Sequence, residues 1–554
     1  METQGAHPPD GGGWGELAAG RWEAARDRFE AQLASSETPE LLEGLSWAAW
    51  WLDDAEAVFH AREQAYRLYR RHGDDENAAR MAAWLAADEL DFHGALAVAA
   101  GWLSRAHRLL DPLEPGPAHG WLAFFEGYVV GIRGEVAAAG ELGREAAALG
   151  RRFGVPDLEM LGLALEGSTL VARGRTEDGM RCLDEATVAA LEGEAAVPIS
   201  GAWACCFLVS ACLSVRDFER AAEWCDRIAE FAERWGSRYM LAFCRSEYGA
   251  VYLWRGRWDE AGALLEASVE DYARSRPAFV PGVRVQLAEL RRRQGRASEA
   301  ARLLDAAGIP AATLGHARLA LDRDDAHTAA DLAERYLRGL PEDSALDRVA
   351  GLELLVQARV AAGQPDGAAE AAHELRALAS KVETVPLRAA ADLADGRVAA
   401  ARGEHDAARV ALEDAVDGLQ RAGAPFETAL ARIELAAVLL ARGRRDAAEH
   451  EASLAVESLA ALGAELELRR ARRALDQARA SGRTTAPGVT ARERDVLRLL
   501  AEGLTNRQIA ERLVVSEHTV HRHVTNVLRK LDLPSRAAAA AYAVRSGLLD
   551  NQDA

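Results

Sequence analysis

Lysine is almost missing from this sequence. Lys381 and Lys530 are the only two among 554 residues, so arginine supplies nearly all of the positive charge. A phosphate-binding loop of the G-x-x-x-x-G-K-[ST] type requires a lysine directly after a glycine. Lys381 follows Ser380 and Lys530 follows Arg529. The sequence therefore excludes a nucleotide-binding loop of this type.

Signals for export and for a membrane are also weak. The first residues, METQGAHPPDGGGWGE, have neither a basic start nor an apolar core, so we expect no signal peptide. Residues 195–215 carry no charge over a length that would cross a bilayer. They contain Pro198 and Gly201, however, and lie in register with the repeats described below. We favour a buried repeat helix, and we expect a cytoplasmic protein with no membrane partner.

Cysteine occurs six times, all between Cys182 and Cys244, and never as a C-x-x-C pair. The favoured interpretation is a set of small apolar side chains packed between helices. A thiol sensor or a metal site is the alternative. The pattern does not indicate the disulfide framework of a small secreted protein. We predict neither a metal nor another cofactor.

Aromatic residues make up only 6% of the chain, while Ala, Leu, Arg and Glu dominate, which favours helix over sheet. All 13 tryptophans lie between Trp14 and Trp258. Two interpretations stay open. The rings either fill wide gaps between the helices of the first half or line a groove that binds a ligand or partner.

A phrase of about 40 residues recurs along most of the chain. It starts at a glycine, has an alanine five positions later and then apolar residues, as in GRWEAARDRF from Gly20 and GRWDEAGALL from Gly256. From Gly94 to Gly443 the starts are 39 to 42 residues apart, with one step of 29. The glycine suits the left-handed end of a helix, and the alanine suits a close helix approach. The pattern predicts stacked helix pairs, an α-solenoid with a long concave surface that resembles tetratricopeptide-type repeats.

The repeats are expected over residues 1–478, followed by a linker over 479–487 and a second domain over 488–554. Net charge is divided unevenly between them. The whole chain carries -20, but residues 488–554 hold ten Arg or Lys and eight Asp or Glu, so the remainder carries about -22. The second domain is expected to form four short helices, because capping residues precede each apolar segment. Those residues are Thr490, Thr505, Ser516 and Ser535.

The third of these helices separates into two faces. Apolar residues recur at spacings of four, three and four and predict the buried side: Val520, Val524, Val527 and Leu531. The opposite side carries polar donors and no carboxylate beyond Glu517, which suits the major groove of DNA. Its members are His518, His521, Arg522, Thr525 and Arg529.

The second domain resembles the LuxR/GerE-type helix-turn-helix family, through T-A-R-E-R-D-V-L (490–497), G-L-T-N-R-Q-I-A (503–510), L-V-V-S-E-H-T-V (513–520), His523, K-L (530–531) and S-R-A (535–537). The resemblance implies that the helix from Ser516 reads DNA. It implies contacts to base edges from His518, His521, Arg522 and Thr525. It implies contacts to phosphates from Thr505, Asn506, Arg507, Thr519, His523 and Lys530.

The resemblance also implies double-stranded DNA as a partner and a homodimer that forms on DNA through the last helix, residues 535–546. The three histidines of the reading helix are expected to face the groove rather than a metal. We therefore predict an all-α, sequence-specific transcriptional regulator, not an enzyme, whose repeats sense a ligand or a protein. The alternative is an interaction scaffold with an accessory DNA-binding domain.

Overall fold

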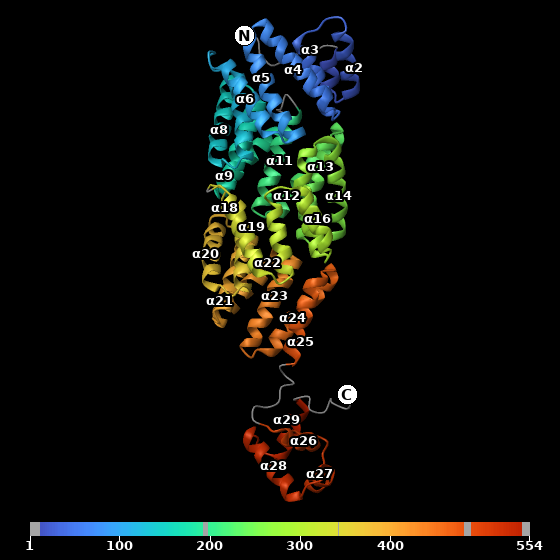
Figure 1. The fold of residues 1–554 in the computed structure, drawn as a ribbon, viewed down its shortest axis with the longest axis vertical. Coiled ribbons are helices and arrows are strands. Elements are labelled where there is room, and N and C mark those ends of the chain that lie inside the picture. Colours follow the sequence, from blue (N-terminus) through green and yellow to red (C-terminus); the bar gives the residue numbers. More distant parts are fainter. Residues whose placement is uncertain (1–11, 192–197, 342, 481–488, 546–554) are drawn as a thin grey trace. The chain divides into compact units, whose positions relative to one another are not determined.

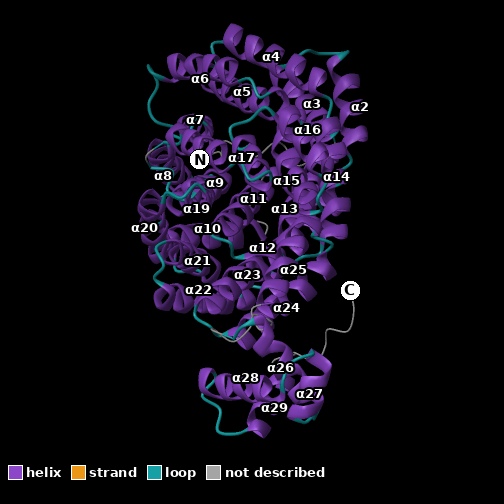
Figure 2. Cartoon of the chain, turned by 60° about the horizontal axis from the view of Figure 1, so that its bottom comes forward, coloured by secondary structure: helices purple, strands orange, loops and turns teal. Residues whose placement is uncertain are grey.

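The computed structural model describes residues 12–191, 198–341, 343–480 and 489–545. All regular elements within these ranges are helices, as the sequence predicts (Figure 1, Figure 2). The chain divides into two compact units, Met1–Ala431 with Ser458–Leu466, and Arg432–Glu457 with Glu467–Ala554. The predicted linker over 479–487 lies mainly outside the described residues.

The repeat helices follow one another in antiparallel pairs. A short π-helix, η1, follows α5, and a 3-10 turn, η2, lies between α14 and α15. Their bounds are α1 (Gly13–Ala18), α2 (Trp22–Leu33), α3 (Pro39–Trp51), α4 (Ala55–His72), α5 (Asp75–Asp88), η1 (Glu89–His93), α6 (Leu96–Leu110), α7 (Pro117–Ile132), α8 (Val136–Phe153), α9 (Pro156–Ala172), α10 (Thr176–Leu191), α11 (Pro198–Ser214), α12 (Phe218–Trp235), α13 (Arg238–Trp254), α14 (Trp258–Ser275), η2 (Pro277–Phe279), α15 (Val280–Arg293), α16 (Ala297–Ala307), α17 (Ala312–Asp322), α18 (Ala326–Gly339), α19 (Asp347–Ala361), α20 (Pro365–Val382), α21 (Val385–Ala401), α22 (His405–Arg421), α23 (Pro425–Ala441), α24 (Arg445–Leu462) and α25 (Glu465–Ala480).

The glycine–alanine phrase has the geometry that its pattern predicts. Gly256 follows the end of α13 with a φ of 76°, in the left-handed region where a side chain is disfavoured. Ala261, five residues later, is fully buried in α14, as is Ala25 in α2 and Ala408 in α22. The close approach of paired helices at these small residues explains why the phrase recurs once in each repeat.

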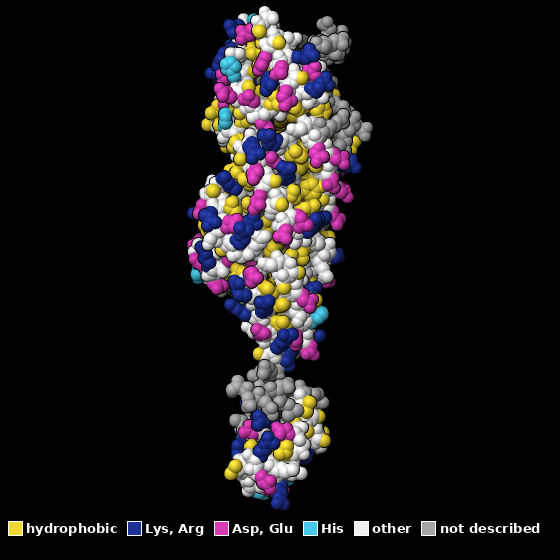
Figure 3. All heavy atoms as spheres, turned by 90° about the vertical axis from the view of Figure 1, so that its right-hand side faces the viewer, with side chains coloured by type: hydrophobic (Ala, Val, Ile, Leu, Met, Phe, Trp, Pro, Cys, Tyr) yellow, Lys and Arg dark blue, Asp and Glu magenta, His cyan; other side chains and the backbone are white. Residues whose placement is uncertain are grey.

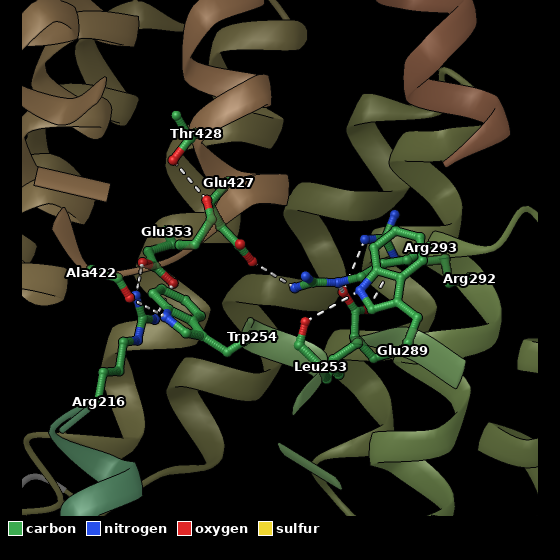
Figure 4. A network of polar contacts seen from close by, with 12 residues as sticks. Arg216, Leu253, Trp254, Glu289, Arg292, Arg293, Glu353, Ala422, Glu427 and Thr428 are labelled. Atoms are coloured by element: carbon green, nitrogen blue, oxygen red, sulfur yellow. Dashed lines mark hydrogen bonds and ion pairs between the residues drawn. The ribbon is translucent and has the colours of Figure 1, made fainter. Parts of the chain in front are cut away.

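Segments 130 to 220 residues apart in the sequence also contact one another. In the network of Figure 4, Arg216 makes two hydrogen bonds to the carboxylate of Glu353, at 2.8 and 2.7 Å, and the indole of Trp254 donates to the carbonyl of Ala422 at 3.0 Å. At the other end of the array, the indole of Trp22 donates to the carbonyl of Trp235 at 2.8 Å. The array therefore coils until its first repeats pack against later ones, instead of leaving its whole inner side open.

Most tryptophans fill the space that this coiling encloses. Nine of the 13 are buried: Trp22, Trp47, Trp50, Trp51, Trp84, Trp121, Trp203, Trp254 and Trp258. Their rings contact one another, with 4.7 Å between the centroids of Trp47 and Trp84 and 5.4 Å between those of Trp84 and Trp121. These buried rings therefore fill gaps between helices, which is the first of the two interpretations given for the tryptophans.

Two buried arginines lie among these rings. Arg62 in α4 lies over the rings of Trp47 and Trp84 and forms an ion pair with Asp88 at 2.5 Å. Arg276, which precedes η2, is fully buried and forms an ion pair with Asp53 at 3.0 Å. The guanidinium groups of both pairs are buried, so removal of Asp88 or Asp53 would leave an uncompensated buried charge.

A third buried carboxyl group, Asp91 in η1, has no arginine of its own. Its hydrogen bond is with the Tyr128 hydroxyl at 3.3 Å. Burial raises the pKa of Asp91 to about 7, because the opposing charges of Arg276 and Arg62 are shared with Asp53 and Asp88. The folded protein therefore holds a proton at Asp91 between about pH 4 and pH 7 that the unfolded chain releases.

The stability of the repeats is expected to fall as pH rises from about 4 to 7, because the unfolded state binds fewer protons in that window. Asp91→Asn, which mimics the neutral acid, should flatten this dependence and raise the unfolding temperature at pH 8 by about 3 °C or more. Thermal unfolding from pH 5 to pH 8 measures both effects. Asp111→Asn, at an exposed position, is the matched control. An unchanged pH profile in Asp91→Asn would show that Asp91 ionises normally.

The cysteines are packed between helices, as the favoured interpretation expects. All six are free thiols, and Cys205, Cys212, Cys225 and Cys244 are buried. Burial raises the pKa of Cys205, Cys212 and Cys244 to about 12, which keeps these thiols protonated and unreactive. Residues 198–214 of the uncharged segment form α11, and no helix in the described ranges is long and apolar enough to span a membrane.

Candidate DNA-reading site

The four C-terminal helices, here called the reader domain, have a small apolar core of their own. They are α26 (Ala491–Ala501), α27 (Asn506–Leu513), α28 (Glu517–Lys530) and α29 (Arg536–Arg545). Val520, Val524 and Val527 of α28 are buried in this core, and Leu531 packs against it. The predicted division of α28 into two faces is therefore correct on its apolar side.

Side-chain caps set where each reading element begins. The Thr505 hydroxyl accepts from the Gln508 backbone N–H and donates to its side-chain oxygen, which fixes the start of α27. The Ser516 hydroxyl accepts from the Thr519 backbone N–H at 3.1 Å and fixes the start of α28. Between the two helices Val514 adopts the left-handed conformation, with a φ of 54°, and its side chain is 89% exposed. This turn orients α28 across α27.

The polar side of α28 faces away from the core. His518, His521, Arg522 and Thr525 are all exposed, and their spacing of three, one and three places them on one side of the helix. The Thr525 hydroxyl donates to the His521 carbonyl at 3.0 Å, within the helix. The side chains of His521 and Arg522 extend into solvent. No group of three metal-ligating side chains occurs in the described parts of the chain.

The six residues expected near phosphates are in less uniform surroundings. Thr505 and Arg507 are exposed, and Arg507 forms a weak surface pair with Glu511 at 3.3 Å. Thr519 and His523 are half-buried beside the start and middle of α28. The remaining two, Asn506 and Lys530, already have partners inside the reader domain.

Arg536 is a structural residue to which the sequence reasoning gave no role. It donates to the side-chain oxygen of Asn506 at 2.6 Å and to the carbonyl of Leu504. These bonds connect α29 to the loop that precedes α27. In the sequence, only its place in the S-R-A motif drew attention to Arg536, and the motif does not indicate which residues the arginine contacts.

Lys530 connects α28 to α26. Its ammonium group contacts the Glu493 carboxylate at 2.7 Å, and the same carboxylate accepts from the Thr490 backbone N–H at 2.8 Å. Burial alone would raise the pKa of Glu493, but the donors of Lys530 and Thr490 hold it below its usual range. Thr490 caps α26, as predicted, and forms a capping box with Glu493, whose carboxylate is also one end of an ion pair across the domain.

Comparison with known proteins identifies this domain. Residues 488–543 match the family described as "Bacterial regulatory proteins, luxR family". Residues 488–543 are a LuxR-type helix-turn-helix domain. The regulator LiaR of Bacillus subtilis (strain 168) is 43% identical over 82 residues, which is 14% of this chain and 39% of LiaR. The nitrate/nitrite response regulator NarL of Escherichia coli (strain K12) is 44% identical over 69 residues, 12% of this chain and 32% of NarL.

A third relative, the putative regulator Rv0890c of Mycobacterium tuberculosis, is 52% identical over 59 residues, 11% of this chain and 7% of that protein. The chain thus spans less than two fifths of each of these relatives, and the similarity is to the LuxR-type domain. Among solved structures, the Cut9–Hcn1 hetero-tetramer of the APC/C covers 83% of this chain and 95% of its own, at 12% identity and a TM-score of 0.36. Yeast Tom70 covers 78% and 95%, at 12% identity and a TM-score of 0.33.

The Glu493 arrangement gives a test of what stabilises the LuxR-type domain. Glu493→Ala removes a buried carboxylate that caps α26 and binds Lys530, so we expect a loss of about 2–3 kcal/mol of domain stability. Amide hydrogen exchange of α26 in the full-length protein measures it. Asp495→Ala breaks only the exposed pair with Arg492, at 3.7 Å, and should cost under about 1 kcal/mol. Equal protection in the two variants would contradict a structural role for Glu493.

Proposed function

We propose that this chain is a sequence-specific transcriptional regulator in which α28 reads DNA and the helical repeats receive a ligand or protein signal. The exposed face of α28 is the observation that carries the proposal. The side chains of His518, His521, Arg522 and Thr525 present polar groups that suit the edges of the major groove, and an arginine binds guanine through two hydrogen bonds. The names of the relatives, all transcriptional regulators, support the same function.

The proposed phosphate contacts divide into two kinds. Thr505, Arg507 and Thr519 lie at the starts of α27 and α28, where backbone N–H groups also favour an anion, and His523 lies in the middle of α28. Asn506 and Lys530 hold the domain together as well, so their loss would weaken DNA binding for two reasons. Arg507 is the better probe of a phosphate contact, because its surface pair contributes little to stability.

The proposed division of the chain is a repeat domain over 1–478, a linker over 479–487 and the reader domain over 488–554. The end of α25 at Ala480 and the start of α26 at Ala491 support these boundaries.

A homodimer on DNA is the proposed binding form. Along α29, Ala537, Ala541 and Val544 are exposed at helical spacing, and the Val544 side chain is 53% exposed. Such a small apolar face suits a second copy of the same helix related by two-fold symmetry. The preferred DNA site should then contain two half-sites about 10 bp apart.

Selection of bound fragments from random duplexes by the full-length protein tests the proposal. Enrichment of one sequence with paired half-sites supports a regulator. If no sequence is enriched, the reader domain has little specificity of its own, and the chain acts as an interaction scaffold instead.

Arg522→Ala should weaken binding to the selected site by about 1–3 kcal/mol and relax the preference at one base pair, because a bidentate contact is lost. Competition between the selected site and its single-base variants measures this. Arg507→Ala is the matched control and should weaken binding to selected and random duplexes alike. An equal loss on both duplexes for Arg522→Ala would remove Arg522 from the base-reading set.

A further inference from the structure

The last repeat helix, α25, has an exposed face made of arginine. Its buried side consists of Leu468, Ala471, Leu475 and Ala478 together with Glu467. On the other side Arg469, Arg472 and Arg473 are exposed. Spacings of three and four residues place these three on one face of the helix, here called the α25 arginine face.

These arginines differ from most others in the repeats, whose guanidinium groups bind carboxylates. Arg376 pairs with Asp392 and Asp395, for example, and on the part of the surface drawn in Figure 3 side chains of both signs are interspersed. Within the described ranges no carboxylate lies within ion-pair distance of the α25 arginine face. Asp476, one turn further along α25, is exposed and not paired with it.

A terminal repeat helix requires a polar outer surface for solubility. That requirement explains why the face is charged. Glu465 and Asp476 are exposed on the same side of α25, and neither forms an ion pair with the three arginines. The three guanidinium groups are close together on the helix and have no ion pair within the described ranges, so their donors remain available to an anion from outside the chain. The repeats carry about -22 in total, so an excess of arginine over carboxylates on this helix is a departure from their own charge pattern.

The α25 arginine face lies close in the sequence to the reader domain, which limits how far apart the two can be. Ten peptide units separate Ala480, at the end of α25, from Thr490, which caps α26. Ten units span at most about 35 Å in any conformation. That length is about one turn of a DNA duplex, along which the two strands carry one charge for every ~1.7 Å of axis. When the reader domain binds a duplex, the tether therefore keeps the end of α25 within about one duplex turn of Thr490, a distance over which phosphates can be reached.

We propose that the α25 arginine face binds the phosphate backbone of the duplex next to the sequence that α28 reads. The inference depends on the proposed function, since it requires the reader domain to bind DNA. It adds a contact outside the LuxR-type domain. That contact contributes affinity without sequence preference and offsets the repulsion between an acidic repeat array and DNA.

The test uses the full-length protein and its triple variant Arg469→Gln, Arg472→Gln, Arg473→Gln. Each binds two duplexes, one of about 20 bp limited to the selected site and one of about 60 bp with flanks, from 50 to 200 mM NaCl. The slope of log K against log salt changes by about 0.9 for each phosphate contact. We expect the triple variant to bind the long duplex roughly tenfold or more weakly and with a shallower slope. Both proteins should bind the short duplex alike.

A second triple variant, Arg71→Gln, Arg105→Gln, Arg108→Gln, removes the same charge from exposed positions on α4 and α6. It should bind both duplexes as the unmodified protein does. Equal binding of the α25 variant and the unmodified protein to the long duplex would overturn the inference. So would an equal loss on both duplexes together with reduced self-association, because the face would then bind protein. Failure of the unmodified protein to distinguish the selected site from a scrambled one would count against the proposed function instead.

Discussion

The contact between the first repeats and the segment before η2 depends on Arg276. Its guanidinium group lies over the rings of Phe92 and Trp50, at 3.8 and 4.5 Å, and pairs with Asp53. These partners belong to the loop after α3, to α3 itself and to η1, more than 180 residues earlier in the chain. A charge buried so completely is tolerated only with its partners in place, so this contact requires the early and late repeats to come together.

The repeat phrase could be predicted from the sequence because its causes are local. A left-handed residue at Gly256 and a close approach at Ala261 follow from backbone sterics within one helix pair. The contacts between distant repeats could not be predicted in the same way. Arg216 and Glu353 are 137 residues apart, and no periodic pattern indicates which arginine meets which carboxylate. The predicted α-solenoid is therefore present, but the contacts between its distant repeats appear only in the structure.

The same distinction applies to the reader domain. Helical spacing alone separated Val520, Val524 and Val527 from the polar side of α28, and the capping residues Thr490 and Thr505 predicted the helix starts. The partners of Lys530 and Asn506 come from other helices, so their structural bonds appear only in three dimensions. A residue can match a family motif and also form a structural bond with another helix. Its substitution would then change both DNA binding and the stability of the domain.

Because the chain has only two lysines, arginine must serve both as a structural cation and as a surface charge. A count of arginines therefore cannot separate the two roles, whereas their surroundings can. Arg62 and Arg276 lie between aromatic rings, with carboxylates matched to them, and stabilise the fold. Arg522 lies on an exposed surface without such a partner, and its planar group keeps its donors available for an outside ligand. Unpaired arginines that share one helix face are thus the informative ones in an acidic protein, since every paired arginine has already been neutralised by the chain itself.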